Sequence, residues 1–422
     1  MDNELEQLRE EKERLRMLLD FGHKVSTEIL NLDDLLKLIM AEARQILNAD
    51  RCSVFIMDSD TKTLWSKIAD GLEDKEIRLP AGKGIIGAVA ESGEILNIKD
   101  AYGDERFNAE TDSKTGYKTR TVLAAPMKNN KGEIIGVFQV LNKQESVFNE
   151  EDEKILLLLA RQAGDAVENA FLYEEQKKMF ESFIETLSHT LDKRDALTAG
   201  HSLRVTYFSL KLGEKLALRR DEIDLLKYSS WMHDLGKIGV REHILAKMGA
   251  LTDEEFEKMK MHTNFTKEIL ERIYFKKEFR GIPLIASSHH ENVDGSGYPD
   301  KLRGTAVPFL ARIIAVCDVF DAITSKRHYR EPMPVMGVLR IIKEGTGKKF
   351  DESCVAAFFK INLYEVLAGI NLEKVDNFFI IPDEKKLLEE YTLEDFYRIL
   401  NVDNFTAPQH KIVETFGKYY GR

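Results

Sequence analysis

The sequence has few cysteines, and none of them is spaced for a bridge. Its 422 residues contain three, Cys52, Cys317 and Cys354, which lie far apart and form no CxxC pair. This argues against a disulfide framework and suits the reducing environment of the cytoplasm, where we expect the protein to reside.

Long apolar runs and excess positive charge are also missing. The longest apolar runs, such as ILLLLA at 155–160, have the size of core segments and not of membrane spans. The N-terminus, MDNELEQLREEKERL, is charged from the start, so we expect no signal peptide. The formal net charge is -11, so the surface as a whole does not attract DNA or anionic lipid. An anionic substrate would therefore need a local basic cluster, and we expect neither DNA nor a membrane as a partner.

The length and composition are those of an ordinary multidomain protein. The hydrophobic share is 43% and the charged share 32%, and 422 residues suffice for two or three domains. We expect a multidomain chain with one α+β domain and one all-α domain. The predicted parts are an N-terminal helix at 1–19, a mixed domain at 20–172, a linker helix at 173–192, an all-helical domain at 193–362 and an extension at 363–422.

The two ends of the chain carry little chemistry. Leucines at 5, 8, 15, 18 and 19 form a loose stripe on the first segment, which is either a short coiled coil or an amphipathic helix that packs on its own domain. The acidic and aromatic segment 363–422 suggests short helices without a recognisable site.

The mixed domain contains clear strand and helix patterns. The segments SVFIMD, TVLAAPM and IGVFQVLN, at 53–58, 121–127 and 135–142, predict strands, and AGKGIIGAVAESG at 81–93 predicts a turn into a short helix. A long helical pattern then runs from Glu150 to about Asp192 and could connect two domains. Its one weak point is Gly164, which costs about 1 kcal/mol relative to alanine in a helix.

Histidines are concentrated in one stretch of the helical domain. Six of the ten lie between residues 201 and 290; five of these, with two aspartates, form an ordered series, and His243 lies outside it. The series is His201, His233, Asp234, His262, His289, His290 and Asp318. Histidine nitrogens and carboxylate oxygens are ligands of iron, manganese and zinc. A single inward histidine is usually a core residue, but burying so many titratable groups without a metal would be costly.

Local patterns place these residues at helix ends or on inward faces. Gly236 is positioned to end the helix before it as a left-handed C-cap. Thr252 and Glu255 predict a capping box that opens a helix with His262 on its inward stripe. Asp318 and Asp321 are three residues apart and share a helix face.

The chain resembles the HD-GYP family of cyclic di-GMP phosphodiesterases over residues 180–362. The matching text is GHSLRV at 200–205, HDLGKIG at 233–239, HHENVDGSGYP at 289–299 and DVFDAITSKRHYR at 318–330. The resemblance implies an all-helical metallohydrolase with two divalent ions, Fe or Mn, with Zn or Ni as alternatives.

The resemblance also assigns ligands to the two ions. One ion would take His201, His233, Asp234 and Asp318, and the other would share Asp234 as a bridge and add His262, His289 and His290. A water or hydroxide between the ions would attack phosphorus. Family members with a third ion carry a glutamate where this chain has Leu197. We therefore expect two ions, and pGpG as the product with GMP as a possible second step.

Other residues of these motifs would contact substrate or support ligands. Lys237, catalytic with Asp234, would bind a phosphate oxygen, and Arg327 and Arg330 suit phosphates and guanine edges. Tyr298, in the loop with Gly295, Gly297 and Pro299, could stack on a guanine. Asp321 would orient a ligand or Lys237, and Asp294 would do the same for the paired histidines.

Residues 20–172 resemble a GAF domain, in particular those of cyclic-nucleotide-regulated enzymes. The resemblance rests on DAYGDERFN at 100–108, DSKTGYKTRTVL at 112–123, and the signature Asn142, Lys143, Phe148, Asp152 and Glu153. It implies an antiparallel sheet flanked by helices, with Lys143 paired to Asp152. The domain would sense a small molecule or a cyclic nucleotide, or serve only as a scaffold for a homodimer formed through the GAF and linker helices.

These observations predict a GAF-regulated phosphodiesterase that opens cyclic di-GMP, with three alternatives left open. The first is hydrolysis of another cyclic dinucleotide or a nucleotide. The second is oxygenation at a di-iron site, which the DGSGYP loop disfavours. The third is a cyclic di-GMP receptor that acts through protein contacts.

Overall fold

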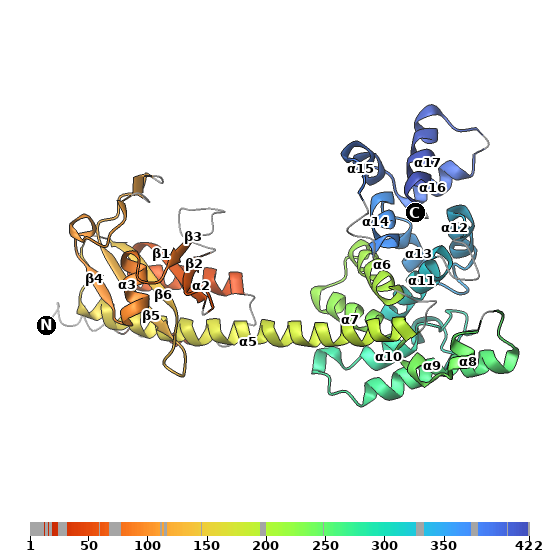
Figure 1. Cartoon of the computed structure of the whole chain (residues 1–422), viewed down its shortest axis with the longest axis horizontal. Helices are drawn as coiled ribbons and strands as arrows, with labels where there is room; N and C mark the ends of the chain where they lie inside the picture. The colour runs from red at the N-terminus through yellow and green to blue at the C-terminus, as the bar shows by residue number, and fades with distance from the viewer. Residues whose placement is uncertain are drawn as a thin grey trace. The chain divides into compact units, whose positions relative to one another are not determined.

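The computed structural model forms two compact units, Met1–Met179 and Phe180–Arg422 (Figure 1). The structure describes residues 12, 16, 19–23, 32–58, 60–66, 77–109, 112, 113, 116–144, 146–194, 200–247, 249–325, 333–372, 379–402 and 404–420. Most of the predicted N-terminal helix at 1–19 lies outside these residues. No helix in the described ranges is long and apolar enough to cross a membrane.

The first unit is built on one antiparallel sheet of six strands in the order β3-β2-β1-β6-β5-β4. The strands are β1 (Ala49–Asp58), β2 (Thr63–Ser66), β3 (Ile77–Pro80), β4 (Leu96–Ile98), β5 (Val122–Lys128) and β6 (Ile134–Lys143). The three strands predicted from sequence are therefore confirmed as parts of β1, β5 and β6. They lie side by side at the centre of the sheet, where their apolar side chains are buried on both faces.

Alternate residues of these strands enter two separate cores. In β6, Phe138 and Val140 join the cluster under α2 (Leu32–Ile46) and α5 (Glu150–Arg194), whereas Val137 joins the cluster under α3 (Gly84–Ser92). This two-residue period is the direct consequence of the pleat. The sheet is thus flanked by helices, as the predicted antiparallel α+β domain requires.

The GAF signature residues hold the ends of the sheet together. The Asn142 side chain accepts hydrogen bonds from the amides of Arg120 and Thr121 at 2.6 and 3.1 Å, and it donates to the Tyr117 hydroxyl at 2.8 Å. Lys143 forms a short ion pair with the buried carboxylate of Asp152. These contacts give the signature a structural role in the domain.

The remaining signature residues, Phe148 and Glu153, both accept hydrogen bonds from the Asn97 side chain. Asn97 donates to the Phe148 carbonyl at 3.0 Å and to the Glu153 carboxylate at 2.8 Å, and the Phe148 ring is fully buried. Strand β4 is thereby tied to the start of α5.

The second unit is helical, and its described residues contain only isolated β-bridges. Its elements are α6 (His201–Lys215), α7 (Arg220–Trp231), η2 (Leu235–Gly239), α8 (Glu242–Leu245), α9 (Asp253–Glu271), η3 (Lys277–Phe279), α10 (Ile282–Ser287), η4 (Gly304–Ala306), α11 (Phe309–Thr324), α12 (Val335–Glu344), α13 (Glu352–Phe358), α14 (Leu363–Ile370), α15 (Pro382–Glu389), α16 (Leu393–Leu400) and α17 (Ala407–Tyr419).

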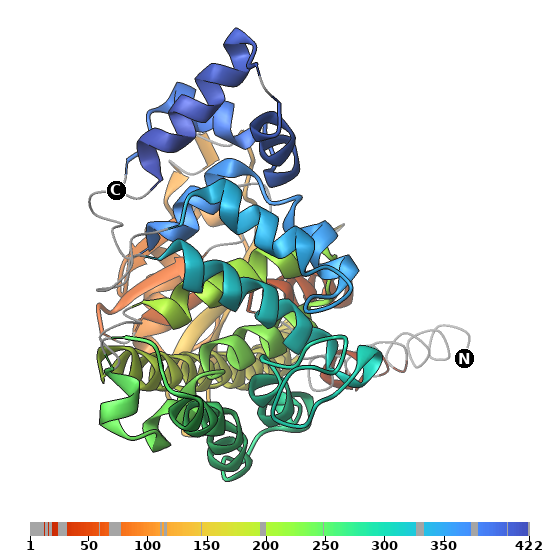
Figure 2. The ribbon, with the colours of Figure 1, turned by 90° about the vertical axis from the view of Figure 1, so that its right-hand side faces the viewer.

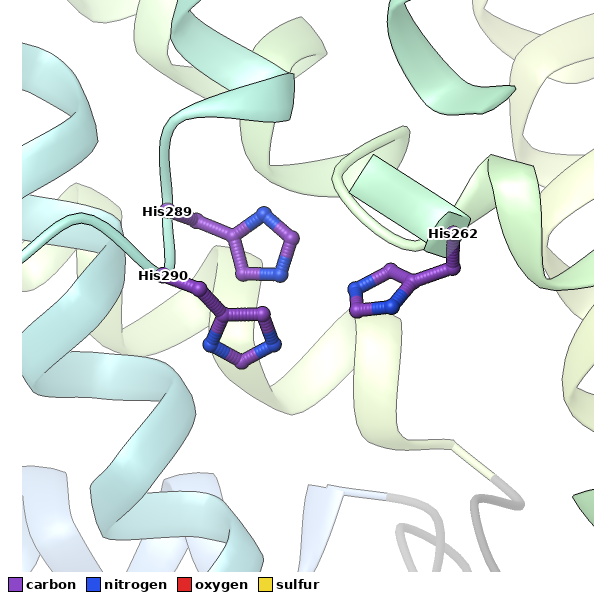
Figure 3. A group of neighbouring side chains, drawn as sticks. All are labelled: His262, His289 and His290. Atoms are coloured by element: carbon purple, nitrogen blue, oxygen red, sulfur yellow. The ribbon is translucent and has the colours of Figure 1, made fainter. Parts of the chain in front are cut away.

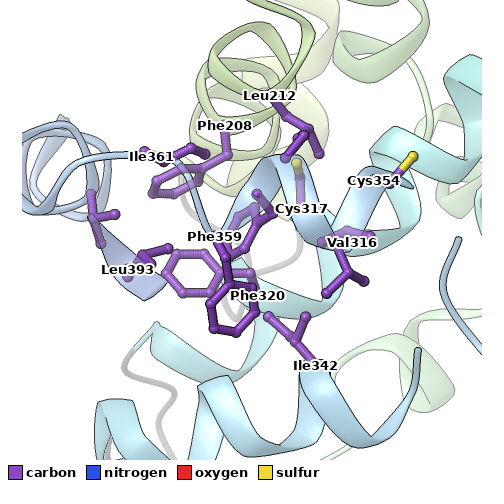
Figure 4. Packing of buried hydrophobic residues seen from close by; sticks show 14 of the residues in the cluster. Phe208, Leu212, Val316, Cys317, Phe320, Ile342, Cys354, Phe359, Ile361 and Leu393 are labelled. Carbon is purple, nitrogen blue, oxygen red and sulfur yellow. The ribbon is translucent and has the colours of Figure 1, made fainter. Parts of the chain in front are cut away.

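One large core connects this unit's central helices with its C-terminal ones. Phe208, Cys317 and Phe320 pack with Phe359 and Leu393 in a single cluster (Figure 4). Further members of the cluster, Phe396 and Phe416, come from α16 and α17. The helices α14 to α17, drawn in blue in Figure 2, therefore contribute to the core that supports α6 and α11.

Gly164 was predicted to be a weak point of the long helix, but the structure gives it a role in packing. A Cβ atom at this position would lie 2.7 Å from the backbone oxygen of Lys128, at the end of β5. The missing side chain therefore allows α5 to approach the sheet, and α5 continues through this position.

We predict that Gly164→Ala destabilises the first unit by about 1–3 kcal/mol, because the added methyl group meets backbone that cannot move cheaply. Hydrogen exchange of β5 should become faster. The matched control is Gly417→Ala, at an exposed helical position of α17 with open space around it. That change should stabilise α17 by up to about 1 kcal/mol. Slower exchange of β5 in Gly164→Ala would contradict the packing role.

Candidate metal centre

The seven predicted ligands come from five separate segments and converge in the second unit. His201 opens α6, His233 and Asp234 lie between α7 and η2, and His262 lies in α9. His289 and His290 follow α10, and Asp318 lies in α11. Among the described residues, these side chains form three groups, and within each group the possible ligand atoms lie within 4.8 Å of one another. The groups are His201, His233 and Asp318; His233, Asp234 and His289; and His262, His289 and His290. Figure 3 shows the last group.

Three of the histidines share one hydrogen-bonding arrangement. The Nδ1 atoms of His233, His262 and His289 lie 2.6–2.7 Å from the carbonyl oxygens of Ser230, Met259 and Ala286, each three residues earlier. A carbonyl can only accept, so Nδ1 carries the proton and the lone pair is on Nε2. All three Nε2 atoms are buried and have no hydrogen-bond partner.

This arrangement fits a divalent metal. A buried nitrogen lone pair without a partner is costly, and a metal ion would satisfy all three at once. Metal-binding histidines usually donate their other ring N–H to a carbonyl or carboxylate, which fixes the ring orientation. The described residues therefore supply the ligand types and the outer hydrogen bonds of a metal site.

Asp234 is the centre of the group. Its two carboxylate oxygens lie 3.5–3.9 Å from the Nε2 atoms of four histidines, namely His201, His233, His262 and His289. Oδ2 faces His201 and His233, whereas Oδ1 faces His262 and His289. One carboxylate thus faces both halves of the ligand set, as a bridging ligand must.

His201 is positioned by a carboxylate in place of a carbonyl. Its Nδ1 atom lies 2.7 Å from Asp321, and its Nε2 atom lies 3.2 Å from Asp318. Asp321 therefore fixes the ring of His201, a predicted ligand, and its role in orienting a bound ligand stays a prediction. Arg204 fixes Asp321 in turn through hydrogen bonds of 2.7 and 3.1 Å.

Arg204 was not among the predicted site residues. It lies one turn after His201 in the same helix, and its buried guanidinium beside an aspartate could have been suspected from the GHSLRV motif. Its partner, however, is 117 residues away in sequence. Only the fold identifies that pairing.

Burial and neighbouring charges shift the pKa values of the histidines in different directions. Burial lowers the pKa of His262 and of His289 to about 4, and it also lowers those of His233 and His290. Burial acts in the same direction on His201, but hydrogen bonds to Asp318 and Asp321 outweigh it and raise its pKa to about 10. Four neutral imidazoles are thus available as ligands.

Lys237 lies against the central carboxylate. Its Nζ atom is 2.7 Å from Asp234 Oδ2. Burial alone would raise the pKa of Asp234, but Lys237 and the surrounding imidazoles hold it well below its ordinary value. The carboxylate is therefore ionised, and an ammonium group stands beside the ligand cluster.

The loop that carries His233 and Asp234 is held tightly on α9. The Thr266 hydroxyl donates to the His233 carbonyl at 3.1 Å and accepts from the Gly236 amide at 2.8 Å. The predicted left-handed C-cap at Gly236 is wrong, because α7 ends at Trp231 with Met232 as its cap. Gly236 is needed for the close approach of this loop to α9 instead, since a Cβ atom there would lie 1.9 Å from the His262 carbonyl oxygen.

The predicted capping box of Thr252 and Glu255 at the start of α9 is confirmed.

The loop after His290 places an aromatic ring beside the histidines. The Tyr298 ring centroid is 4.8 Å from that of His290 and 6.4 Å from that of His262. Glu291, which the sequence analysis did not single out, accepts from the amides of Asp300 and Leu302 at 2.6 and 3.0 Å and so fixes this loop. Asp294 accepts from the Ser296 amide and hydroxyl and so stabilises the turn, and the support of the paired histidines predicted for it stays a prediction.

Three predicted positions lie outside the described residues. They are Leu197, at the site of the third-ion glutamate, and Arg327 and Arg330, the predicted substrate contacts. Their roles remain predictions.

The pKa values predict a maximum in the stability of the metal-free protein near pH 6.5. Imidazoles such as His262 and His289 bind protons when unfolded but not when folded between about pH 4 and 6.5, so unfolding becomes less favourable as pH rises. His201 has the opposite sign: its contribution is complete below about 6.5 and is lost as pH rises towards 10.

Urea unfolding of chelator-treated protein between pH 4.5 and 9.5 would test this. Asp321→Asn should flatten the alkaline side, whereas the exposed His243→Gln should leave the curve unchanged. A stability that rises steadily through pH 9 would contradict the assignment.

Comparison with protein families identifies both units. Residues 31–167 match the GAF domain family, and residues 185–354 match the HD domain family.

Individual relatives resemble parts of the chain. The cyclic di-GMP phosphodiesterase of Thermotoga maritima is 36% identical over 209 residues, which are 50% of this chain and 55% of that protein. The 3'3'-cGAMP-specific phosphodiesterase 3 of Vibrio cholerae is 31% identical over 208 residues, covering 49% and 43%. The dual 3',5'-cyclic-AMP and -GMP phosphodiesterase 11A of Takifugu rubripes is 40% identical over 187 residues, covering 41% and 20%.

The matched part therefore spans at most 55% of the length of these three relatives. The sheet of the first unit, the helical second unit and the family matches agree with one another. The chain joins an N-terminal GAF domain to a C-terminal HD domain.

Proposed function

We propose that the chain is a metal-dependent phosphodiesterase that opens cyclic di-GMP. The observation that carries the proposal is the set of three buried, partnerless Nε2 atoms around the Asp234 carboxylate. Similarity to proteins named as cyclic di-GMP phosphodiesterases supports the choice of reaction.

The predicted ligands would form two groups, one near each carboxylate oxygen of Asp234, and each group would hold one ion. His201, His233 and Asp318 form one group, and His262, His289 and His290 form the other. Bound divalent ions at such a site supply Lewis-acid activation of water and neutralise charge at the phosphate. Fe or Mn suits this mixture of imidazole and carboxylate, with Zn or Ni as alternatives.

The side chains around the ions would bind and orient the substrate. Lys237 places an ammonium group beside the bridging carboxylate, where it can hold a phosphate oxygen as a point charge. Tyr298 offers an aromatic face to a guanine base. Arg327 and Arg330 would add further positive charge to the site of an otherwise acidic chain.

The product we propose is linear pGpG, because Leu197 replaces the glutamate that would help to hold a third ion. Two alternatives remain distinct outcomes. Similarity to a 3'3'-cGAMP-specific enzyme makes another cyclic dinucleotide the leading alternative substrate. A receptor that binds cyclic di-GMP without cleaving it is the other.

The GAF domain would regulate this activity through a small-molecule effector. Within the second unit, α5 contacts the helix that leads to the metal ligands: Ser188 donates to the Trp231 carbonyl at 2.7 Å, two residues before His233. Glu181 accepts a hydrogen bond from Tyr228 and pairs with Lys227 on α7. A displacement of α5 would therefore act on the segment that carries His233 and Asp234.

Anaerobic turnover of cyclic di-GMP by protein loaded with Fe(II) or Mn(II) tests the proposed function. We expect accumulation of pGpG. Asp234→Ala should lower turnover by at least about 100-fold and reduce bound metal at both positions, because metal sites lose affinity steeply when ligands are removed. His262→Ala should reduce metal mainly at one position.

The control is His243→Ala, the exposed histidine outside the ligand series. Binding of intact cyclic di-GMP without cleavage under any metal would favour the receptor. Cleavage of 3'3'-cGAMP alone would favour the other substrate.

We also propose a homodimer that uses the first unit's part of α5. Leu158, Leu172 and Met179 are 57%, 54% and 68% exposed, and their separations are whole heptads, so they share one face. Leu172→Glu should shift the protein towards monomer in sedimentation experiments, because it places a charge in that seam. Leu157→Glu, off this face, should have less effect. A monomeric parent protein at micromolar concentration would contradict the proposal.

A further inference from the structure

A lysine on α9 stands at the edge of the metal centre without a role in the mechanism above. Lys260 precedes the ligand His262 by two residues in α9. Its Nζ atom lies over the Tyr298 ring, 5.6 Å from the centroid, and over the Phe256 ring, 5.0 Å from the centroid. The ammonium thus lies close to two aromatic rings, one of which belongs to the predicted base contact Tyr298.

The ion pair made by Lys260 leaves it available to a ligand. Its Nζ atom is 2.6 Å from Glu257, whose side chain is 70% exposed, whereas the Lys260 side chain is 28% exposed. Exposed pairs of this kind contribute at most about 1 kcal/mol. A ligand that offers good acceptors can therefore replace Glu257 at little cost.

The ammonium lies within reach of the edge of a base stacked on Tyr298. A base that lies flat on an aromatic ring is separated from it by about 3.5 Å. The Lys260 ammonium, 5.6 Å from the Tyr298 centroid, is then close enough to move to the edge of such a base. Lysine has a long flexible stem and only donors, so it contacts acceptors on that edge.

We propose that Lys260 determines base specificity by donating hydrogen bonds to O6 and N7 of a guanine stacked on Tyr298. The inference rests on the proposed function, because it concerns the substrate of the same site. Guanine presents two acceptors at this edge, whereas adenine presents N7 and an amino donor. An ammonium group, which cannot accept, favours guanine and is repelled by the adenine amino group.

Phe256 has a supporting role in this site. It is 47% exposed although it lies on the helix that carries His262, and its ring faces the Lys260 ammonium. A cation over two rings is held in place by both. The lysine is thereby kept near Tyr298 before substrate arrives.

The test compares guanine and adenine dinucleotides in Lys260→Met. The kcat/KM for cyclic di-GMP is measured together with the inhibition constant of cyclic di-AMP against that turnover. We expect kcat/KM for cyclic di-GMP to fall at least about fivefold, the lower end of the discrimination given by a good base contact. The inhibition constant of cyclic di-AMP should stay the same or decrease, and Lys260→Arg should restore most of the guanine preference.

Lys258→Met is the matched control. This lysine lies on the same helix and pairs with Glu254 as Lys260 pairs with Glu257, but its side chain is 53% exposed. It should leave both constants unchanged. Repeating the measurements at two salt concentrations separates base contact from electrostatic steering, because steering weakens with salt.

Equal losses for both dinucleotides in Lys260→Met would overturn the proposal and assign Lys260 to phosphate binding. No change in either constant would also overturn it. If the parent protein cleaves no dinucleotide, the proposed function fails, and calorimetric titration of the metal-loaded protein with the same two ligands still decides whether Lys260 selects guanine.

Discussion

The second unit depends on one constraint: buried imidazole nitrogens must find partners. His233, His262 and His289 each donate from one ring nitrogen to the carbonyl three residues earlier, which leaves the other nitrogen directed at Asp234. Within the described residues, hydrogen bonds satisfy the Nδ1 atoms of these three rings and leave their Nε2 atoms without a partner. A divalent ion would satisfy the rest, so the fold of the second unit and its proposed chemistry would have the same physical origin.

The ligands can converge only because the backbone segments that carry them approach closely. Gly236 lets the segment after Asp234 contact α9, where any side chain would collide with the His262 carbonyl. Gly297 does the same for the loop of Tyr298, since a Cβ atom there would lie 2.5 Å from the His290 carbonyl oxygen. These glycines set the spacing between the two halves of the ligand set. The core shared by α6, α11 and the C-terminal helices then fixes His201 and Asp318 opposite them.

The site carries positively charged side chains although the chain as a whole is acidic. The chain is acidic overall, yet Lys237 and Lys260 place two ammonium groups at the ligand cluster and at the Tyr298 ring. Arg204 is used differently, because it donates hydrogen bonds that fix Asp321 behind His201. Positive charge close to the predicted ligands thus divides between two lysines proposed to contact substrate and one arginine that holds Asp321 in place.

The sequence by itself determined the central strands, the long helix and which histidines and aspartates belong together, because each depends on short-range periodicity or on motifs with unusual residue types. The tertiary structure decided what depends on distant partners. It paired Arg204 with Asp321 across 117 residues, gave Gly164 and Gly236 their packing roles, and joined the C-terminal helices to the core. It also brought Lys260 to Tyr298. Local patterns specify which face of a helix is buried, but only the folded chain specifies which side chain lies opposite that face.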